Sequence, residues 1–374
     1  MTDLIAPFDA GEEQTGLVAT SGVGATPDED RPRSVRSVTS EQTGEALVAG
    51  VAAVAFVIVL RVVLDWNGVM GSALYGYGFF LTFYYLILRR SAGRILATDR
   101  LITTAIWSSG LVVAAVLVWM VAFVVVKGWP ALRPGFFTQD LAKVGPRDKG
   151  GGARHAIIGT LEQVGIATIF AVPVAVLTAV YLHEISGRMT RVIRFIVDAM
   201  SGLPSIVAGL LIFSLTGLFG AGFSGIKGAS ALFILMLPTV TRTSEEILRT
   251  IPGSLREASM ALGAPQWRVV LQVVVPTGLA GLTTAAILGI ARAIGETAPM
   301  LLTALGTNAT NVNPLKGAQS DLPLFVWALV RLPNKTLQER AWTGALILVL
   351  LVLVLFVLAR AVGNRSARRL GRNR

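Results

Sequence analysis

Apolar runs of membrane length recur along most of the chain after its first forty residues. A helix needs about 20 apolar residues to cross about 30 Å of hydrocarbon, so each run is long enough to span a bilayer. Because hydrocarbon offers the backbone no hydrogen-bond partners, such runs must become helices. The runs cover residues 46–64, 69–88, 101–126, 156–182, 195–218, 228–248, 269–305 and 341–362. The sequence therefore predicts an all-α, polytopic membrane protein.

Composition supports a membrane location and excludes several kinds of site. The chain is 53% hydrophobic and only 15% charged, which is too apolar for a soluble protein of 374 residues. The formal net charge of +11 comes from Arg and Lys that flank the apolar runs, as membrane topology requires, so no nucleic-acid partner is expected. The absence of cysteine excludes a disulfide framework, a thiolate metal site and a cysteine nucleophile.

The distribution of charges predicts eight crossings with both termini in the cytoplasm. Residues 1–44 are polar, with no apolar signal segment, and are expected to form a disordered cytoplasmic tail. Residues 45–100 are expected to form a transmembrane hairpin that precedes the main transmembrane domain, residues 101–363. The basic segment 364–374 should remain in the cytoplasm.

The run 269–305 is too long for one straight crossing. Pro276 and Pro299 are expected to bend or break it, because proline removes a backbone donor and clashes with the preceding turn. The run 195–218, by contrast, is expected to cross the membrane as one helix.

A charged segment, residues 249–268, lies between two membrane-length runs and must therefore be a loop. Apolar residues recur in it near helical spacing, which predicts an amphipathic helix. Ser254 and Glu257 have the spacing of a capping box at the start of that helix. Gly263 should end the helix, and Pro265 should keep it from restarting at once.

Three ionisable residues are placed where the membrane is expected to make an unpaired charge cost a few kcal/mol: Arg242, Arg292 and Glu296. Arg292 and Glu296 are four residues apart, so they can form a buried ion pair that only fixes helix packing. Alternatively, Arg242 and Arg292 on neighbouring helices would make an anion site, because the guanidinium fork matches phosphate oxygens. Asp198 follows Arg194 by four residues and is expected to be its partner.

The loop also carries a recognisable motif. Glu257-Ala258-Ser259, then three residues, Gly263, nine residues and Val273–Pro276 resemble the EAA loop of bacterial ABC-transporter permeases, EAA-x3-G-x9-I-x-L-P. Ser replaces the second Ala, and Val replaces both Ile and Leu. In that family the loop forms the coupling helix, which sits in a cleft of the ATPase subunit. The resemblance assigns ATPase coupling to Arg256, Glu257, Ala258, Ser259 and Gly263.

Residues 150–362 resemble the PstA-type permease subunits of bacterial phosphate-specific ABC transporters, and the segment ARAIGETAP is specific to that branch. The resemblance implies a type I, MetI-like core of six helices in the cytoplasmic membrane of a bacterium. It also implies that Arg242 and Arg292 take part in phosphate translocation and that Glu296 accompanies them. The hairpin 45–100 is additional to this six-helix pattern.

No Walker A motif occurs, so ATP and Mg²⁺ are expected on a partner chain rather than on this one. The resemblance implies a second, PstC-type permease, two PstB-type ATPases and an external PstS-type phosphate-binding protein. Other readings are a permease for sulfate, molybdate or phosphonate, a channel, or a polytopic membrane enzyme. An enzyme would need a catalytic or metal constellation, yet His155 and His183, the only histidines, lie at opposite ends of one predicted helix.

Overall fold

The computed structural model describes residues 40–64, 68–148, 150–218 and 222–372. Over those residues the regular structure is helical, apart from two isolated bridges that join Ser224 to Gly317 and Leu305 to Gln319. The chain divides into two compact units, Met1–Val113 and Ala114–Arg374. The all-α fold predicted from the apolar runs is confirmed. The predicted tail 1–44 lies almost entirely outside the described residues.

The first unit contains a helical hairpin. The helices of this unit are α1 (Ser40–Leu64), α2 (Val69–Ser91) and the first part of α3 (Gly93–Gly128), and α1 and α2 form the hairpin. Arg61 Nε donates to Ser72 Oγ at 2.9 Å, and this contact near the connecting turn shows that α1 and α2 run antiparallel. The rings of Phe56 and Phe79 pack edge to face between the two helices, 4.2 Å apart at their centroids. The hairpin lies where the sequence predicts two extra helices.

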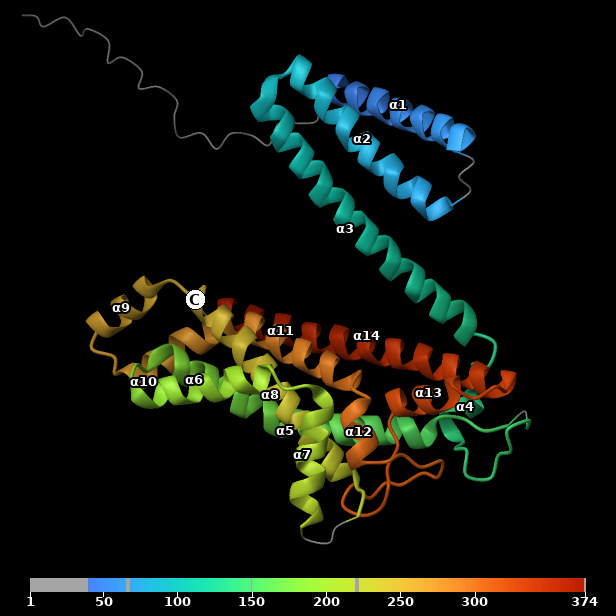
Figure 1. The fold of residues 1–374 in the computed structure, drawn as a ribbon. Helices are drawn as coiled ribbons and strands as arrows, with labels where there is room; N and C mark the ends of the chain where they lie inside the picture. Colours follow the sequence, from blue (N-terminus) through green and yellow to red (C-terminus); the bar gives the residue numbers. More distant parts are fainter. Residues whose placement is uncertain (1–39, 65–67, 149, 219–221, 373–374) are drawn as a thin grey trace, which may run out of the picture. The chain divides into compact units, whose positions relative to one another are not determined.

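The second unit is built around four long helices that run side by side, α5, α8, α11 and α14 (Figure 1). Figure 1 places α9 and α10 at one end of this bundle, and α4 and α13 at the other. The helices of this unit beyond α3 are α4 (Pro134–Thr138), α5 (Arg154–Glu184), α6 (Arg188–Ser201), α7 (Ser205–Gly217), α8 (Gly225–Arg249), α9 (Gly253–Ala261), α10 (Gln266–Val269), the π-helical turn η1 (Val270–Val274), α11 (Val275–Ile294), α12 (Ala298–Thr303), α13 (Leu322–Val330) and α14 (Lys335–Arg372).

Small residues bring the bundle helices close together. On α5, a stripe of four alanines at four-residue intervals is fully buried: Ala167, Ala171, Ala175 and Ala179. Side chains without bulk let backbones approach, which is how helices pack where the lipid is as apolar as the protein. On α11, a Cβ on Gly289 would lie 2.3 Å from Val240 Cγ2 of α8. These contacts set the spacing of α5, α8 and α11.

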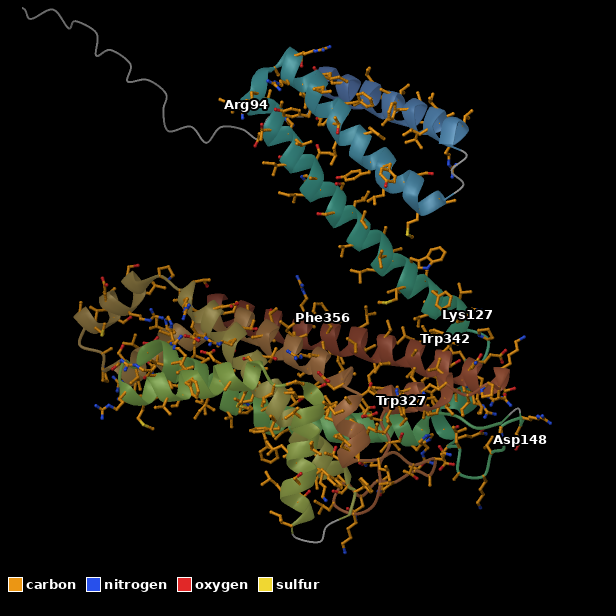
Figure 2. All side chains as sticks on the ribbon, in the orientation of Figure 1. Arg94, Lys127, Asp148, Trp327, Trp342 and Phe356 are labelled. Atoms are coloured by element: carbon orange, nitrogen blue, oxygen red, sulfur yellow. The ribbon has the colours of Figure 1, made fainter. Side chains whose placement is uncertain are left out.

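The second half of α3 is anchored to the start of α14. Phe123 packs edge to face against Trp342 with 5.2 Å between ring centroids, and Lys127 lies over the Phe123 ring. Figure 2 shows Lys127 and Trp342 near each other at this junction. A Cβ on Gly128 would lie 2.7 Å from the Trp342 carbonyl oxygen, so only glycine permits this approach. Thr343 Oγ1 donates to the Gly128 carbonyl at 2.7 Å and completes the anchor.

Six helices among the described residues are long and apolar enough to cross a membrane, or seven if one bent pair counts as a span. Eight crossings were predicted from the apolar runs, which is more than the number of described helices that are long and apolar enough to span a membrane. The predicted run that is missing from this count is 228–248, which corresponds to α8; this helix carries Lys227, Arg242, Glu245 and Glu246 and is therefore less apolar than the others. The crossing of the bilayer by α8 stays a prediction.

The predicted crossing over 195–218 is not one continuous helix, although α6 and α7 together are apolar enough to count as one bent span. Helices α6 and α7 are separated by a three-residue break and meet at an angle of 108°. Pro204 adopts an extended conformation, with φ −58° and ψ 138°, and Leu203 before it is disfavoured in a helix by the proline ring. Hydropathy alone did not show the break, because α7 is so apolar that the pair passes as one span even though α6 carries Arg191, Arg194 and Asp198.

The predicted interruption of the run 269–305 is confirmed near Pro299, where a break at 295–297 separates α11 from α12. Pro299 lies in the first turn of α12, where a missing backbone donor costs nothing. The chain stays helical through Pro276, which follows the π-helical turn η1 at the start of α11. The segment ARAIGETAP therefore ends one helix and begins another.

The predicted external loop 306–340 contains a helix, α13. Asp321 caps it, since the Asp321 carboxylate accepts a hydrogen bond from the Leu324 amide at 2.7 Å. This carboxyl is buried, and burial raises its pKa to about 7, although the bond from Leu324 opposes the rise. Near neutral pH, Asp321 is therefore close to its point of titration.

Candidate functional site

Arg242 and Arg292, the two arginines singled out from the sequence, line one cavity of about 230 Å³. Arg242 comes from α8 and Arg292 from the last turn of α11, so the cavity lies where two bundle helices meet α6 and α7. Its lining consists of Met200, Ser201, Leu203, Leu235, Pro238, Thr239, Arg242, Thr243 and Arg292. The cavity thus combines two cationic side chains with three hydroxyls.

The break between α6 and α7 forms one wall of this cavity. Ser201 is the last residue of α6 and Leu203 lies in the break itself, and both line the space. A continuous helix would fill this position with its own backbone and side chains. The proline that disrupts the helix therefore also opens the site.

Arg292 makes two polar contacts. Its Nε lies 3.7 Å from Glu296 Oε1, so the contact expected from the i,i+4 spacing is present. Its Nη1 donates to Thr239 Oγ1 at 3.1 Å, which joins α11 to α8 across the cavity. Just over half of the Arg292 side chain is exposed, against 16% for Glu296. Glu296 is not among the residues that line the cavity, so it reaches the site only through Arg292.

Arg242 is paired with carboxylates on both sides. Its Nη2 contacts Asp198 Oδ1 of α6, and its Nη1 lies 3.4 Å from Glu245 Oε2. The predicted pair of Arg194 with Asp198 is wrong, because Arg194 Nη1 instead contacts Glu245 Oε1 at 2.7 Å. Packing of α6 against α8 brings cross-helix partners nearer than the partner one turn away on the same helix.

Glu245 is a charged residue that the sequence reasoning did not single out. Its side chain is only 3% exposed and contacts three arginines, with Arg194 at 2.7 Å, Arg249 at 2.9 Å and Arg242 at 3.4 Å. A buried carboxylate costs several kcal/mol unless it is paired, so the arginines offset that cost. The available signal was its position three residues after Arg242 and four before Arg249 on one helix.

The predicted loop helix is present as α9 (Gly253–Ala261). The predicted capping box is wrong: Pro252 occupies the N-cap, Ser254 lies inside the helix, and no side chain caps its start. The predicted exit at Gly263 is confirmed, since its φ is +82°. The Gly263 amide bonds the Met260 carbonyl at 2.9 Å, as in a Schellman C-cap.

The candidate coupling residues of α9 face different directions. Glu257 and Ala258 are exposed, and Ser259 is half-buried with its hydroxyl bonded to the Leu255 carbonyl. Arg256 turns toward the bundle, where its Nε lies 3.1 Å from Glu184 Oε1 at the end of α5. Its Nη2 also lies 2.7 Å from His183 Nε2. Arg256 therefore connects α9 to α5 and does not project outward.

Apolar side chains project from α9 and the segment that follows it. They are Leu255, Met260, Leu262 and Trp267, exposed by 39%, 48%, 89% and 60%. Large apolar residues gathered on a short charged helix are typical of a surface that contacts another protein. In the part of the chain that the structure describes, no three His, Cys, Asp or Glu residues gather as metal ligands would.

Comparison with known proteins bears on this arrangement. The profile of the family described as "Binding-protein-dependent transport system inner membrane component" matches residues 171–370. Phosphate transport system permease protein PstA 1 of Mycobacterium tuberculosis (strain ATCC 25618 / H37Rv) is 39% identical over 292 residues, which cover 77% of this chain and 93% of that protein. PstA of Pasteurella multocida (strain Pm70) is 37% identical over 246 residues, covering 65% of this chain and 86% of that protein.

Among solved structures, the MetNI methionine ABC transporter in an inward-facing conformation matches with a TM-score of 0.44 and 22% identity. The match covers 59% of this chain and 94% of that one.

Proposed function

The chain belongs to the family of binding-protein-dependent transport system inner membrane components, among the PstA-type permeases, and we propose that it forms half of a pathway that imports inorganic phosphate. As a multi-pass inner membrane permease subunit, it is not the catalytic part of its transporter. Both termini would lie in the cytoplasm.

The observation that carries the proposal is the pairing of Arg242 and Arg292 in one cavity with hydroxyl groups. A guanidinium presents two parallel donors that match two oxygens of a phosphate, and guanidinium–phosphate pairs are among the stronger charge-assisted hydrogen bonds. Thr239, Thr243 and Ser201 add donors that can complete the coordination. A small oxyanion fits this set better than a neutral or cationic solute.

Selectivity for phosphate over sulfate would follow from the different protonation of the two anions. Near neutral pH phosphate carries at least one proton, whereas sulfate carries none. Glu296 lies beside Arg292, with Oε1 at 3.7 Å from Nε, and its carboxylate can accept a hydrogen bond from a protonated oxyanion or repel one that lacks a proton. Its position outside the cavity wall means that Arg292 must shift for this contact to form.

Coupling to ATP would occur at α9. The exposed apolar residues around α9 suit a cleft on an ATPase partner, where ATP and Mg²⁺ would be held. Closure of the two ATPases would move α9, and the contact of Arg256 with Glu184 would pass that motion to α5. A second permease of PstC type, two PstB-type ATPases and a PstS-type external phosphate-binding protein would complete the assembly.

Phosphate uptake by the complete transporter in proteoliposomes tests the proposal. Arg242→Gln and Arg292→Gln should each lower uptake at least about fivefold, since loss of a charged hydrogen-bond donor costs about 1–3 kcal/mol. Arg191→Gln is the matched control, because Arg191 is an exposed arginine of α6 that does not line the cavity. Wild-type uptake by both cavity variants would refute the site. Uptake of sulfate in preference to phosphate by the wild type would refute the substrate.

A further inference from the structure

The carboxylate of Asp198 forms an ion pair with the guanidinium of Arg242, one of the two arginines that line the cavity. Resting on the proposed function, we propose that the Asp198 carboxylate is a built-in competitor of the transported oxyanion for Arg242. The oxyanion displaces Asp198 when it enters the cavity, and Asp198 returns to Arg242 when the oxyanion leaves.

Two ion pairs join α6 to α8, and together we call them the ion-pair ladder. One rung is Arg194 with Glu245, at 2.7 Å, and the other is Asp198 with Arg242. Each helix contributes one cation and one anion about one turn apart, so the charges alternate along the contact. Arg242 also lies 3.4 Å from Glu245, so Glu245 connects the two rungs.

The two rungs differ in how readily they open. The Glu245 side chain is 3% exposed and is held by three arginines, and water cannot readily replace any of them as a partner of a buried carboxylate. The Asp198 side chain is 49% exposed, and solvent can replace Arg242 as its partner. An exposed ion pair contributes only about 0.2–1 kcal/mol. The Asp198 rung is therefore the weaker one, and its arginine, Arg242, lines the cavity.

An oxyanion in the cavity has an advantage over Asp198. A carboxylate and a phosphate use the same guanidinium donors, so both cannot occupy them fully. The oxyanion meets Arg242 and Arg292 together, because both line the cavity, whereas among the described residues Asp198 forms an ion pair with Arg242 and none with Arg292. Once the oxyanion departs, Asp198 neutralises Arg242 again. A transport site needs this balance, since a site that binds too tightly cannot release.

Displacement of Asp198 also has a local structural consequence. Asp198 lies in the last turn of α6, and the helix ends at Ser201, which lines the cavity. Opening the Asp198 rung frees this last turn from α8, while the rung of Arg194 and Glu245 holds the preceding turn. The motion is thereby confined to the break between α6 and α7.

The test uses the complete transporter in proteoliposomes, in a form that transports without the external binding protein, so that KM reports on the permease. The KM and kcat for inorganic phosphate are measured for wild type, Asp198→Asn, Asp198→Glu and Arg194→Gln. Asp198→Asn should lower KM about two- to fivefold, the worth of an exposed ion pair. It should also lower kcat, because phosphate leaves Arg242 more slowly. Asp198→Glu keeps a carboxylate and should retain a KM near that of wild type.

Arg194→Gln separates competition from loosening of the helix. It breaks the other rung of the ion-pair ladder but leaves Asp198 on Arg242 and frees Glu245 to hold Arg242 more closely, so KM should not fall. An unchanged or raised KM in Asp198→Asn would overturn the proposal, and so would an equal fall in KM in Arg194→Gln. Loss of uptake in Arg242→Gln and Arg292→Gln keeps the proposed function in place whichever way Asp198 behaves, so the two failures are distinguishable.

Discussion

The contact of Arg256 with Glu184 offers a sharp test of how the α9 loop communicates with the bundle. We predict that reversing either charge uncouples ATP hydrolysis from transport, and that reversing both restores coupling in part. The variants are Arg256→Glu, Glu184→Arg and the double variant. Each single change places two like charges where an ion pair stood, with Nε and Oε1 3.1 Å apart.

The size of the effect follows from burial and geometry. The Arg256 and Glu184 side chains are 19% and 10% exposed, so water screens them less than it screens a surface pair. The two atoms form an ion pair without hydrogen-bond alignment, which argues against the upper end of the range for buried pairs. A coupling energy of about 1–3 kcal/mol is reasonable, which corresponds to a factor of about 5–150.

The assay measures binding-protein-stimulated ATPase activity and phosphate uptake on the same proteoliposomes. The number of phosphates imported per ATP hydrolysed should fall in both single variants, and the double variant should recover at least fivefold over the worse single variant. Arg188→Glu is the control, because Arg188 is an exposed residue at the start of the nearby helix α6. Its charge change alone should leave the ratio unchanged.

A non-additive recovery is the signature of direct interaction, since independent sites give additive free energies. If the double variant is no better coupled than the worse single variant, Arg256 does not act through Glu184. Arg256 would then contact the ATPase instead, as the other α9 residues are expected to do.

Three further predictions concern other parts of the chain. Gly263→Leu should lower coupled uptake, because a φ of +82° costs a non-glycine residue about 1–2 kcal/mol, whereas Gly253→Ala, at a helical glycine with open space, should not; equal uptake in both would refute the role of this exit. Glu296→Gln should reduce the preference for phosphate over sulfate by about five- to a hundredfold in the binding-protein-independent form, and an unchanged ratio would make Glu296 only the structural partner of Arg292. Folding raises the pKa of Asp321 from 3.8 to about 7, so the folded state binds its proton more tightly and stability falls as pH rises from about 4 to about 7, by at most about 4 kcal/mol. Asp321→Asn, which can still cap α13, should therefore flatten the fall in melting temperature between pH 5 and pH 8, and an unchanged slope would contradict this.

Local sequence patterns were sufficient for several features of the fold. Membrane-length apolar runs forced helices, because hydrocarbon leaves the backbone no other way to satisfy its hydrogen bonds. Gly263 predicted the end of α9, since only glycine adopts its positive φ at little cost. The spacing of Arg292 and Glu296 predicted their contact, because four residues separate neighbours on a helix face.

Local patterns failed where a competing partner came from another helix. The spacing that worked for Arg292 and Glu296 failed for Arg194 and Asp198, because α8 offered Glu245 to one and Arg242 to the other. Ser254 had the spacing of a capping box, yet the helix begins after Pro252 and leaves Ser254 inside it. In both cases residues of the right type stood at the right spacing, but the neighbouring structure gave them other positions or other partners.

The sequence by itself determined which residues could serve: the two arginines, the acid beside one of them, and the loop that carries the EAA-like motif. Only the tertiary structure decided how they act together. The 108° break between α6 and α7 opens the cavity that Arg242 and Arg292 share, and hydropathy does not reveal it because the two helices together are apolar enough to pass as one span. Charges in a low-dielectric bundle pair with whatever opposite charge packing brings nearest, and that choice depends on the approach of α6 to α8, a distance that no spacing along one helix encodes.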